Sequence, residues 1–316
     1  MDKALWEYWV PLSVRALPRV ASRATDEWAL RNQPEEGSFL PLKPYPPLAT
    51  PEHVVRAAQE AAAHPHSAPA RGLASLREGI ARHLGSECGA ATDPETEVLV
   101  TNGGMHAMDI VFRTLLEPGD EVVVPSPCFF LEGLVERWGA KLSFVSMHEE
   151  DDFQWDMERI EDAITKRSKI LFVNTPVNPT GRVLTRKELE ELLGIAARHH
   201  LCILSDESYD QLTYDGREHI SPLALPGGKE HTVLIRSFTK SFVMPAWRVG
   251  YIVAEARLTE LFLKMFEWTN LYANEVCQAA AAAAINGSDD WRANAASLLQ
   301  RNRDRVLAGI GRTEGL

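Results

Sequence analysis

Two neighbouring stretches are the most informative: residues 237–240 read Ser-Phe-Thr-Lys, and residues 245–251 read Pro-Ala-Trp-Arg-Val-Gly-Tyr. They place Lys240 eight residues before Arg248, with apolar and small residues between them. A buried lysine loses its proton readily, and its neutral amine can form a Schiff base with a carbonyl carbon. Arg248 keeps its charge, and its planar fork of donors suits a phosphate group. Together they describe a site for pyridoxal phosphate (PLP), unless both are ordinary surface residues at the end of a strand.

The composition is that of an ordinary globular enzyme, because 45% of the 316 residues are hydrophobic and 24% are charged. This length fits one large domain with a smaller one. The net charge of −11, without a basic stripe, argues against nucleic-acid binding. The spacing of the cysteines gives no CxxC pair or metal pattern, which indicates reduced thiols in a cytoplasmic protein; they are Cys88, Cys128, Cys202 and Cys277. No apolar run is long enough to span a membrane, and residues 1–6 lack the apolar segment of a signal peptide.

Short apolar strands alternate with helices along most of the chain, and this pattern predicts an α/β fold with a mostly parallel sheet and helices on both faces. Strands are expected at 97–100, 121–124, 142–146, 170–173, 202–205, 233–236 and 249–253. Helices are expected at 51–63, 73–84, 105–116, 129–138, 185–199, 257–285 and 290–310. No internal repeat is evident.

Ligands in such sheets bind where the strands end at their carboxyl edge. Residues 101–105, Thr-Asn-Gly-Gly-Met, join a predicted strand to a helix, and the glycines would let backbone N–H groups reach an anion. The alternative is a plain tight turn. Residues 174–181 read Asn-Thr-Pro-Val-Asn-Pro-Thr-Gly after another strand. An asparagine held there could donate to a phenolate oxygen, or the run could be only a loop.

Three more side chains follow predicted strands. Asp206 comes directly after the strand at 202–205, where a carboxylate is costly unless it pairs with a cation such as a protonated pyridine nitrogen. The alternative for Asp206 is the N-cap of a helix. Tyr209 could share its site. Phe129 could stack on a flat ring or belong to the core.

In their order and placement, these motifs resemble the class I/II aminotransferase family of PLP enzymes, with the fold of aspartate aminotransferase (fold type I), over about residues 50–286. The resemblance implies a three-layer α/β/α PLP-dependent transferase large domain with a partial small domain. It implies that Lys240 is the Schiff-base lysine and proton shuttle, that Asp206 pairs with the pyridine nitrogen, and that Tyr209 completes the catalytic set. Asn178 and Tyr209 would hold the ring hydroxyl, and Phe129 would stack on the ring. The phosphate contacts would come from Gly103, Gly104, Met105, Ser237 and Arg248.

The function expected from the resemblance is a PLP-dependent aminotransferase that moves an amino group between an amino acid and a 2-oxo acid by a ping-pong mechanism. The alternatives are a PLP-dependent lyase, decarboxylase or oxidase on the same fold, or a PLP-binding domain without turnover. A regulatory domain is disfavoured because residues 1–50 contain no basic DNA-binding helix pair. A homodimer is expected, with Trp6, Tyr8 and Trp9 as an arm across the partner.

The substrate half departs from the family pattern. We expect an N-terminal segment at 1–48, the PLP-binding domain at 49–287, and at 288–316 the start of a small domain that ends before the family's carboxylate-binding arginine. Arg312 is not in a matching motif. Ser67 stands where the family has a tyrosine, five residues before the glycine of a Gly-x-x-x-Leu-Arg motif, and residues 44–46 replace a Gly-Glu-Pro-type loop. A substitute for the missing arginine could come from the partner chain or from Arg15, Arg19, Arg23 or Arg31.

Overall fold

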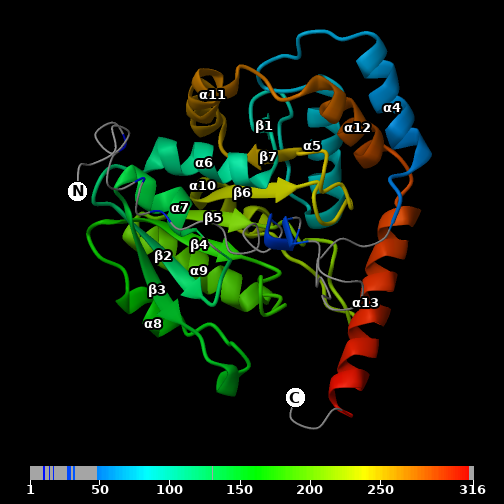
Figure 1. Cartoon of the computed structure of the whole chain (residues 1–316). Helices are drawn as coiled ribbons and strands as arrows, with labels where there is room; N and C mark the ends of the chain where they lie inside the picture. Colours follow the sequence, from blue (N-terminus) through cyan, green and yellow to red (C-terminus); the bar gives the residue numbers. More distant parts are fainter. Residues whose placement is uncertain are drawn as a thin grey trace, which may run out of the picture.

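The computed structural model describes residues 48–129 and 131–312, together with residues 10, 14, 17, 27–29, 31 and 32 near the N-terminus. Several predicted features lie outside this part of the chain: the arm residues Trp6, Tyr8 and Trp9, the arginines Arg15, Arg19 and Arg23, and the loop at 44–46. In Figure 1 the described chain forms a central sheet flanked by helices, with helix α13 (Asp290–Ile310) running down one side.

Within the part of the chain that the structure describes, the sheet has seven strands in the order β1-β7-β6-β5-β4-β2-β3. The strands are β1 (Val98–Thr101), β2 (Glu121–Ser126), β3 (Lys141–Ser146), β4 (Ser168–Asn174), β5 (Cys202–Asp206), β6 (Thr232–Ser237) and β7 (Gly250–Val253). Only β7 is antiparallel to its neighbours, β1 and β6. The other six strands therefore run in one direction, and their carboxyl ends share one edge of the sheet. The predicted mostly parallel sheet is confirmed.

Helices cover both faces of the sheet, as the alternating pattern predicts (Figure 1). Besides α13, the α-helices that the structure describes from residue 48 onward are α4 (Glu52–Ala63), α5 (Ala74–Cys88), α6 (Gly104–Leu115), α7 (Glu132–Val135), α8 (Met157–Asp162), α9 (Arg186–His199), α10 (Gly228–His231), α11 (Ala256–Asn270) and α12 (Glu275–Asn286). Short 3-10 helices are η1 (Glu136–Trp138), η2 (Glu149–Asp151) and η3 (Pro222–Ala224).

The core lies on both faces, because successive residues of a strand point to opposite sides. In β4, Ile170 and Phe172 join the apolar cluster that includes α5, α6 and α11, whereas Leu171 and Val173 join the cluster under α9. A strand buried on both sides must be apolar throughout. This explains the short continuous apolar runs in the sequence.

Two expected helices differ from the structure. The single helix predicted over 257–285 is wrong, because the chain breaks into α11 and α12 at Leu271, whose φ is +57°. Asn274 then caps α12 by accepting a hydrogen bond from the backbone of Cys277 over 3.0 Å. The helix expected from residue 129 begins only at Glu132, as α7, and continues as η1.

Candidate active site

The predicted site residues follow the carboxyl ends of five strands, on the shared edge of the sheet. Gly103 follows β1, Phe129 follows β2, Asn178 follows β4, Tyr209 follows β5 and Lys240 follows β6. Segments far apart in the sequence therefore converge, as expected for a ligand site in a parallel sheet.

A cavity of about 560 Å³ opens at this edge. Asn178, Tyr209, Thr239 and Lys240 line it, together with the loop at 176–183, the segment at 212–217 and residues of α13. The Nδ2 of Asn178 donates to the hydroxyl of Tyr209 over 3.4 Å, and the Nζ of Lys240 lies 5.8 Å from the centre of the Tyr209 ring. Three of the predicted residues thus face one space, which is large enough for a small aromatic ligand.

Lys240 is half-buried, and its surroundings favour the neutral amine. Burial lowers the pKa of Lys240, the charge of Arg248 lowers it further, and Asp206 opposes the shift only in part. A larger fraction of neutral amine makes this lysine a better nucleophile than a surface lysine.

Asp206 is buried at the end of β5, with 5% of its surface exposed. Its Oδ1 accepts hydrogen bonds from the backbone of Ser208 over 3.0 Å and from the Ser208 hydroxyl over 2.6 Å. Burial raises the pKa of Asp206 to about 6, against the effect of these bonds. Oδ2 has no donor among the described residues, which leaves it open to a cationic partner. The chain continues in a turn rather than a helix, so the N-cap alternative is wrong.

An anion-binding cradle lies at the N-terminus of α6. Gly103 has φ of +86°, and a Cβ added to it would come within 2.5 Å of the Nη2 of Arg248. The guanidinium therefore packs directly on the backbone where the first N–H groups of α6 have no helical partner. Ser237 lies close by, because its Cβ would be 3.5 Å from a Cβ on Gly104. A helix N-terminus, a hydroxyl and a guanidinium together suit a phosphate.

Thr239 joins this cradle to the cavity, and sequence reasoning missed it. The hydroxyl of Ser237 donates to its Oγ1 over 2.7 Å, and the Nη1 of Arg248 donates to the same oxygen over 3.4 Å. Thr239 also lines the cavity beside Lys240. Its place in the Ser-x-Thr-Lys run was the available signal, since a hydroxyl two residues after Ser237 can fold back on it.

Asn174 and Ser208 are also missed, and both position predicted residues. The Nδ2 of Asn174 donates to the backbone oxygen of Asp206 over 2.9 Å, and its Oδ1 accepts from the backbone of Asn178 over 2.7 Å. Asn174 thereby joins the loop of Asn178 to the end of β5. Ser208 orients the carboxylate of Asp206 through the two bonds described above.

Two predicted residues, Met105 and Phe129, lie outside the lining of the cavity. Met105 lies in the first turn of α6 with 37% of its surface exposed, so its backbone rather than its side chain can serve an anion. Phe129 packs against the edge of the larger apolar cluster and does not line the cavity. Their roles stay predictions.

PLP fits this arrangement by its chemistry. The cradle offers cationic and hydroxyl donors to a phosphate, the Asn178–Tyr209 pair offers donors to a ring hydroxyl, and Asp206 offers an anion to a ring nitrogen. Lys240 supplies an amine at the wall of the cavity that it shares with Asn178 and Tyr209.

Comparison with known proteins agrees with this arrangement. The sequence model of aminotransferase class I and II matches residues 45–316. The chain belongs to this family. Its members use pyridoxal phosphate as their cofactor.

Several relatives and one solved structure show how similar the chain is to members of this family. YugH of Bacillus subtilis is 38% identical over 221 residues, 69% of this chain and 57% of YugH. Aromatic-amino-acid aminotransferase 2 of Thermococcus litoralis is 34% identical over 78% of this chain and 64% of that protein. The chain thus spans less than two thirds of these two relatives. The structure of aspartate aminotransferase from Thermus thermophilus with maleate superposes with a TM-score of 0.90 and 33% identity, over 96% of this chain and 80% of that one.

Proposed function

We propose that this chain is a PLP-dependent aminotransferase that moves an amino group between an amino acid and a 2-oxo acid in a ping-pong cycle. The observation that supports this most strongly is the position of Lys240. Its amine has a lowered pKa and lies at the wall of a cavity shared with Asn178 and Tyr209. Thr239, the residue before it, is hydrogen-bonded to the anion-binding cradle.

Each group has a role that follows from its chemistry. The cradle of Gly103, Gly104, Ser237 and Arg248 would bind the phosphate, and the backbone of Met105 would add to it. Asn178 and Tyr209 would hold the ring hydroxyl, and Phe129 would contact the ring face. When bound, PLP supplies an electron sink for the bond that breaks at the substrate Cα. Asp206 would keep the ring nitrogen protonated, and Lys240 would move the proton from the substrate Cα to the cofactor carbon, as transfer of the amino group requires.

The cavity opens beside this lysine and leaves room for a substrate. Its outer wall includes Arg182, Arg217 and Arg303, which could attract a carboxylate. Two of them are already engaged, because Arg182 pairs with Glu188 over 2.6 Å and Arg303 with Asp215 over 2.6 Å. Arg217 remains as the third arginine of the lining. The proposed substrate classes are an amino acid and a 2-oxo acid, with no preferred substrate side chain assigned.

An assay of both half-reactions tests the proposal against the other PLP reactions. The PLP-loaded protein is given a panel of amino acids, first with and then without a 2-oxo acid acceptor. An aminotransferase makes catalytic amounts of product only with the acceptor present. Continuous release of ammonia without an acceptor would indicate a lyase, and release of carbon dioxide a decarboxylase.

We also propose a homodimer whose interface includes the last turn of α11 and the segment between α11 and α12. Trp268 is 92% exposed, and Leu271 and Tyr272 beside it are exposed as well. A tryptophan so exposed, next to further apolar side chains, is typical of an interface. The backbone of Asn274 in the same segment donates to Asn102 over 3.4 Å, so the patch adjoins the β1–α6 loop of the cradle.

We propose a cytoplasmic location because all four cysteines are free thiols. Among the described residues, no helix has the length and apolar character needed to cross a membrane. We further propose that residues 49–287 form the PLP-binding domain, since they contain the whole sheet, and that 288–316 begin a second unit.

A further inference from the structure

A group of buried charges lies beside the candidate site and has no part in the chemistry above. Its centre is Arg236 in β6, which is 2% exposed. The Nη2 of Arg236 lies 2.9 Å from Oε2 of Glu207, and its Nη1 lies 2.7 Å from Oδ2 of Asp210. We call these three residues the buried ion cluster. Glu207 is 0% exposed.

Each member of the buried ion cluster is the chain neighbour of a predicted site residue. Glu207 follows Asp206, Asp210 follows Tyr209, and Arg236 precedes Ser237. The cluster therefore lies at the bases of the two segments that would hold the ring and the phosphate. If Arg236 moved relative to Glu207, Ser237 would move relative to Asp206, because each is joined to its cluster neighbour by a single peptide bond.

Glu207 is fully satisfied by its surroundings. Its Oε1 accepts from the hydroxyls of Ser205 over 2.9 Å and Ser221 over 2.7 Å, and the Nε2 of His219 lies 2.8 Å from Oε2. Burial on its own would raise the pKa of Glu207, but Arg236, His219 and Ser221 outweigh it and hold the pKa at about 2. The carboxylate is thus charged at every pH at which the protein would work.

The ion pair of Arg236 and Glu207 joins β6 to β5 at the carboxyl ends of these two neighbouring strands. Asp206 pairs with Ile235 in the parallel ladder, and the backbone of Glu207 donates to the oxygen of Ile235 over 2.9 Å. Beyond this point β5 turns toward Tyr209 and β6 continues toward Lys240. The Nε and Nη2 of Arg236 both donate to Oε2 of Glu207, over 3.2 and 2.9 Å, and two such bonds from one planar guanidinium fix both distance and direction between the two segments.

We propose that Arg236 and Glu207 are positioning residues, whose ion pair fixes the end of β5 relative to the end of β6 and so sets the separation between Asp206 and the Ser237–Lys240 segment. The inference rests on the proposed function, because it takes these two segments to grip opposite parts of one rigid cofactor. A rigid ligand gains affinity only where its contacts are held at the matching spacing.

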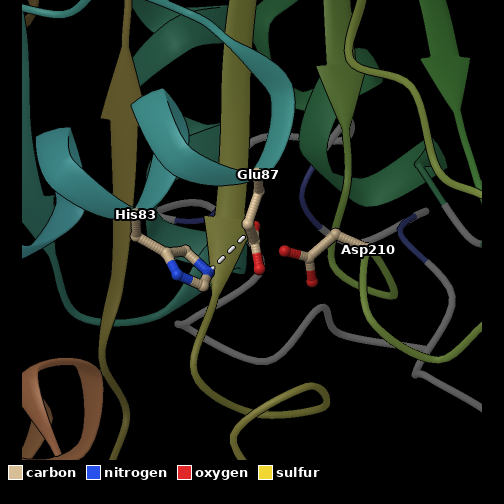
Figure 2. Close-up of side chains that lie close together, drawn as sticks. All are labelled: His83, Glu87 and Asp210. Atoms are coloured by element: carbon tan, nitrogen blue, oxygen red, sulfur yellow. Dashed lines mark ion pairs between the residues drawn. The ribbon is translucent and has the colours of Figure 1, made fainter.

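The cluster continues toward α5 through Glu87. Figure 2 shows His83 and Glu87 on this helix, with the carboxylate of Asp210 turned toward Glu87. Their ligand atoms lie within 4.8 Å of one another, a spacing that a metal ion could use. The Nη1 of Arg236 already donates to both carboxylates, at 3.1 Å to Glu87 and 2.7 Å to Asp210. The guanidinium thus supplies the positive charge that a metal would bring.

The test compares cofactor affinity with stability. Glu207→Gln removes the charge of the pair, Arg236→Lys removes the planar fork, and Ser221→Ala removes one donor to Glu207. The matched control is Glu97→Gln. Glu97 is a buried carboxylate that pairs with Lys229 over 2.7 Å just before β1, at the opposite edge of the sheet. Each protein is prepared without cofactor, its melting temperature is measured, and PLP is titrated by absorbance to obtain Kd.

We expect Kd to rise about tenfold or more in Glu207→Gln and Arg236→Lys, and about fivefold in Ser221→Ala, while Glu97→Gln loses stability without a change in Kd. If Glu207→Gln does not fold, the two milder variants decide. Folded variants that keep the wild-type Kd would overturn the inference. Loss of affinity on dialysis against EDTA, restored by zinc, would overturn it in favour of a metal site. A wild-type protein that binds no PLP would instead refute the proposed function.

Discussion

The side-chain amide of Asn178 donates a hydrogen bond to the hydroxyl of Tyr209 over 3.4 Å, although the two residues are 31 positions apart. The bond joins the loop after β4 to the turn after β5. Both side chains face the cavity of Lys240. Two donors held at one point suit a ring oxygen that carries negative charge.

Replacing Tyr209 by phenylalanine tests this pair. Without the phenol, the ionised ring oxygen of bound PLP loses a charge-assisted hydrogen bond. The deprotonated form of bound PLP is then less stable, so the pKa of the bound cofactor should rise by about one unit. A pH titration of the absorbance measures it.

The matched control is Tyr214→Phe, because Tyr214 lines the same cavity with its ring 5.1 Å from the Arg303 guanidinium carbon. Its absorbance pKa should stay at the wild-type value. Equal shifts in both variants would mean that the Asn178–Tyr209 pair does not contact the ring oxygen.

Asp206→Asn should keep the fold and lose turnover by about a hundredfold or more, because a neutral amide cannot keep the ring nitrogen protonated. Steady-state kinetics with the preferred amino acid measure the loss. Near-normal turnover would assign Asp206 a structural role only.

The same substitution has a consequence for the stability of the cofactor-free protein. The pKa of Asp206 is about 6 in the folded protein against an ordinary value of 3.8, so the folded state binds this proton more tightly than the unfolded state. The stability that Asp206 contributes is complete below pH 3.8 and is lost as the pH rises through 6, by about 3 kcal/mol. Urea unfolding on both sides of this window should show the loss in wild type and not in Asp206→Asn. Parallel pH profiles would contradict the buried placement of Asp206.

Gly103→Ala should damage the phosphate cradle. A Cβ at this position would come 2.5 Å from the Nη2 of Arg248 and would push the guanidinium away. PLP affinity should fall about tenfold, since a charge-assisted contact is lost. Gly227→Ala is the control, because Gly227 also has a positive φ, +74°, but no atom within 4 Å of its added Cβ. Both variants should lose about 1 kcal/mol of stability from strain, and a similar loss of PLP affinity in both would refute a specific cradle.

Trp268→Glu should turn the proposed dimer into a monomer, because a charge replaces an apolar anchor in the exposed patch. Light scattering at micromolar concentration measures the mass. Phe144→Glu is the control, since Phe144 is another exposed aromatic residue, on strand β3 at the far edge of the sheet. A wild-type monomer, or a Trp268→Glu dimer as stable as wild type, would contradict the proposed interface.

Most of the sheet could be predicted from the sequence, since strands buried on both faces must be short apolar runs. The break at Leu271 was missed because the long apolar pattern and the alanine run at 279–284 favour one continuous helix, although Asn270 and Asn274 are weak helix formers and Asn274 caps α12. A left-handed residue without glycine leaves no local signal. The antiparallel direction of β7 could not be predicted either. It depends on the path of the chain between Lys240 and Gly250, and hydrophobic periodicity carries no information about that path.

The candidate site was predictable where a side chain lies at the end of a strand or within a few residues of it, as Asp206 and Lys240 do. Residues that act through another residue were not. Asn174 holds the loop of Asn178, and Arg236 pairs with Glu207 across two strands and 29 positions of sequence. The register between neighbouring strands determines which of these residues meet. Their pairing can therefore be recognised only in the structure, where β5 lies beside β6.

The most direct test of the central claim is to find which residue carries the cofactor. The protein is incubated with PLP, reduced with borohydride, digested and mapped by mass spectrometry. The account predicts one modified residue, Lys240, and no covalent label in Lys240→Ala. Label on another lysine, such as Lys229 or Lys264, or no label at all, would contradict it.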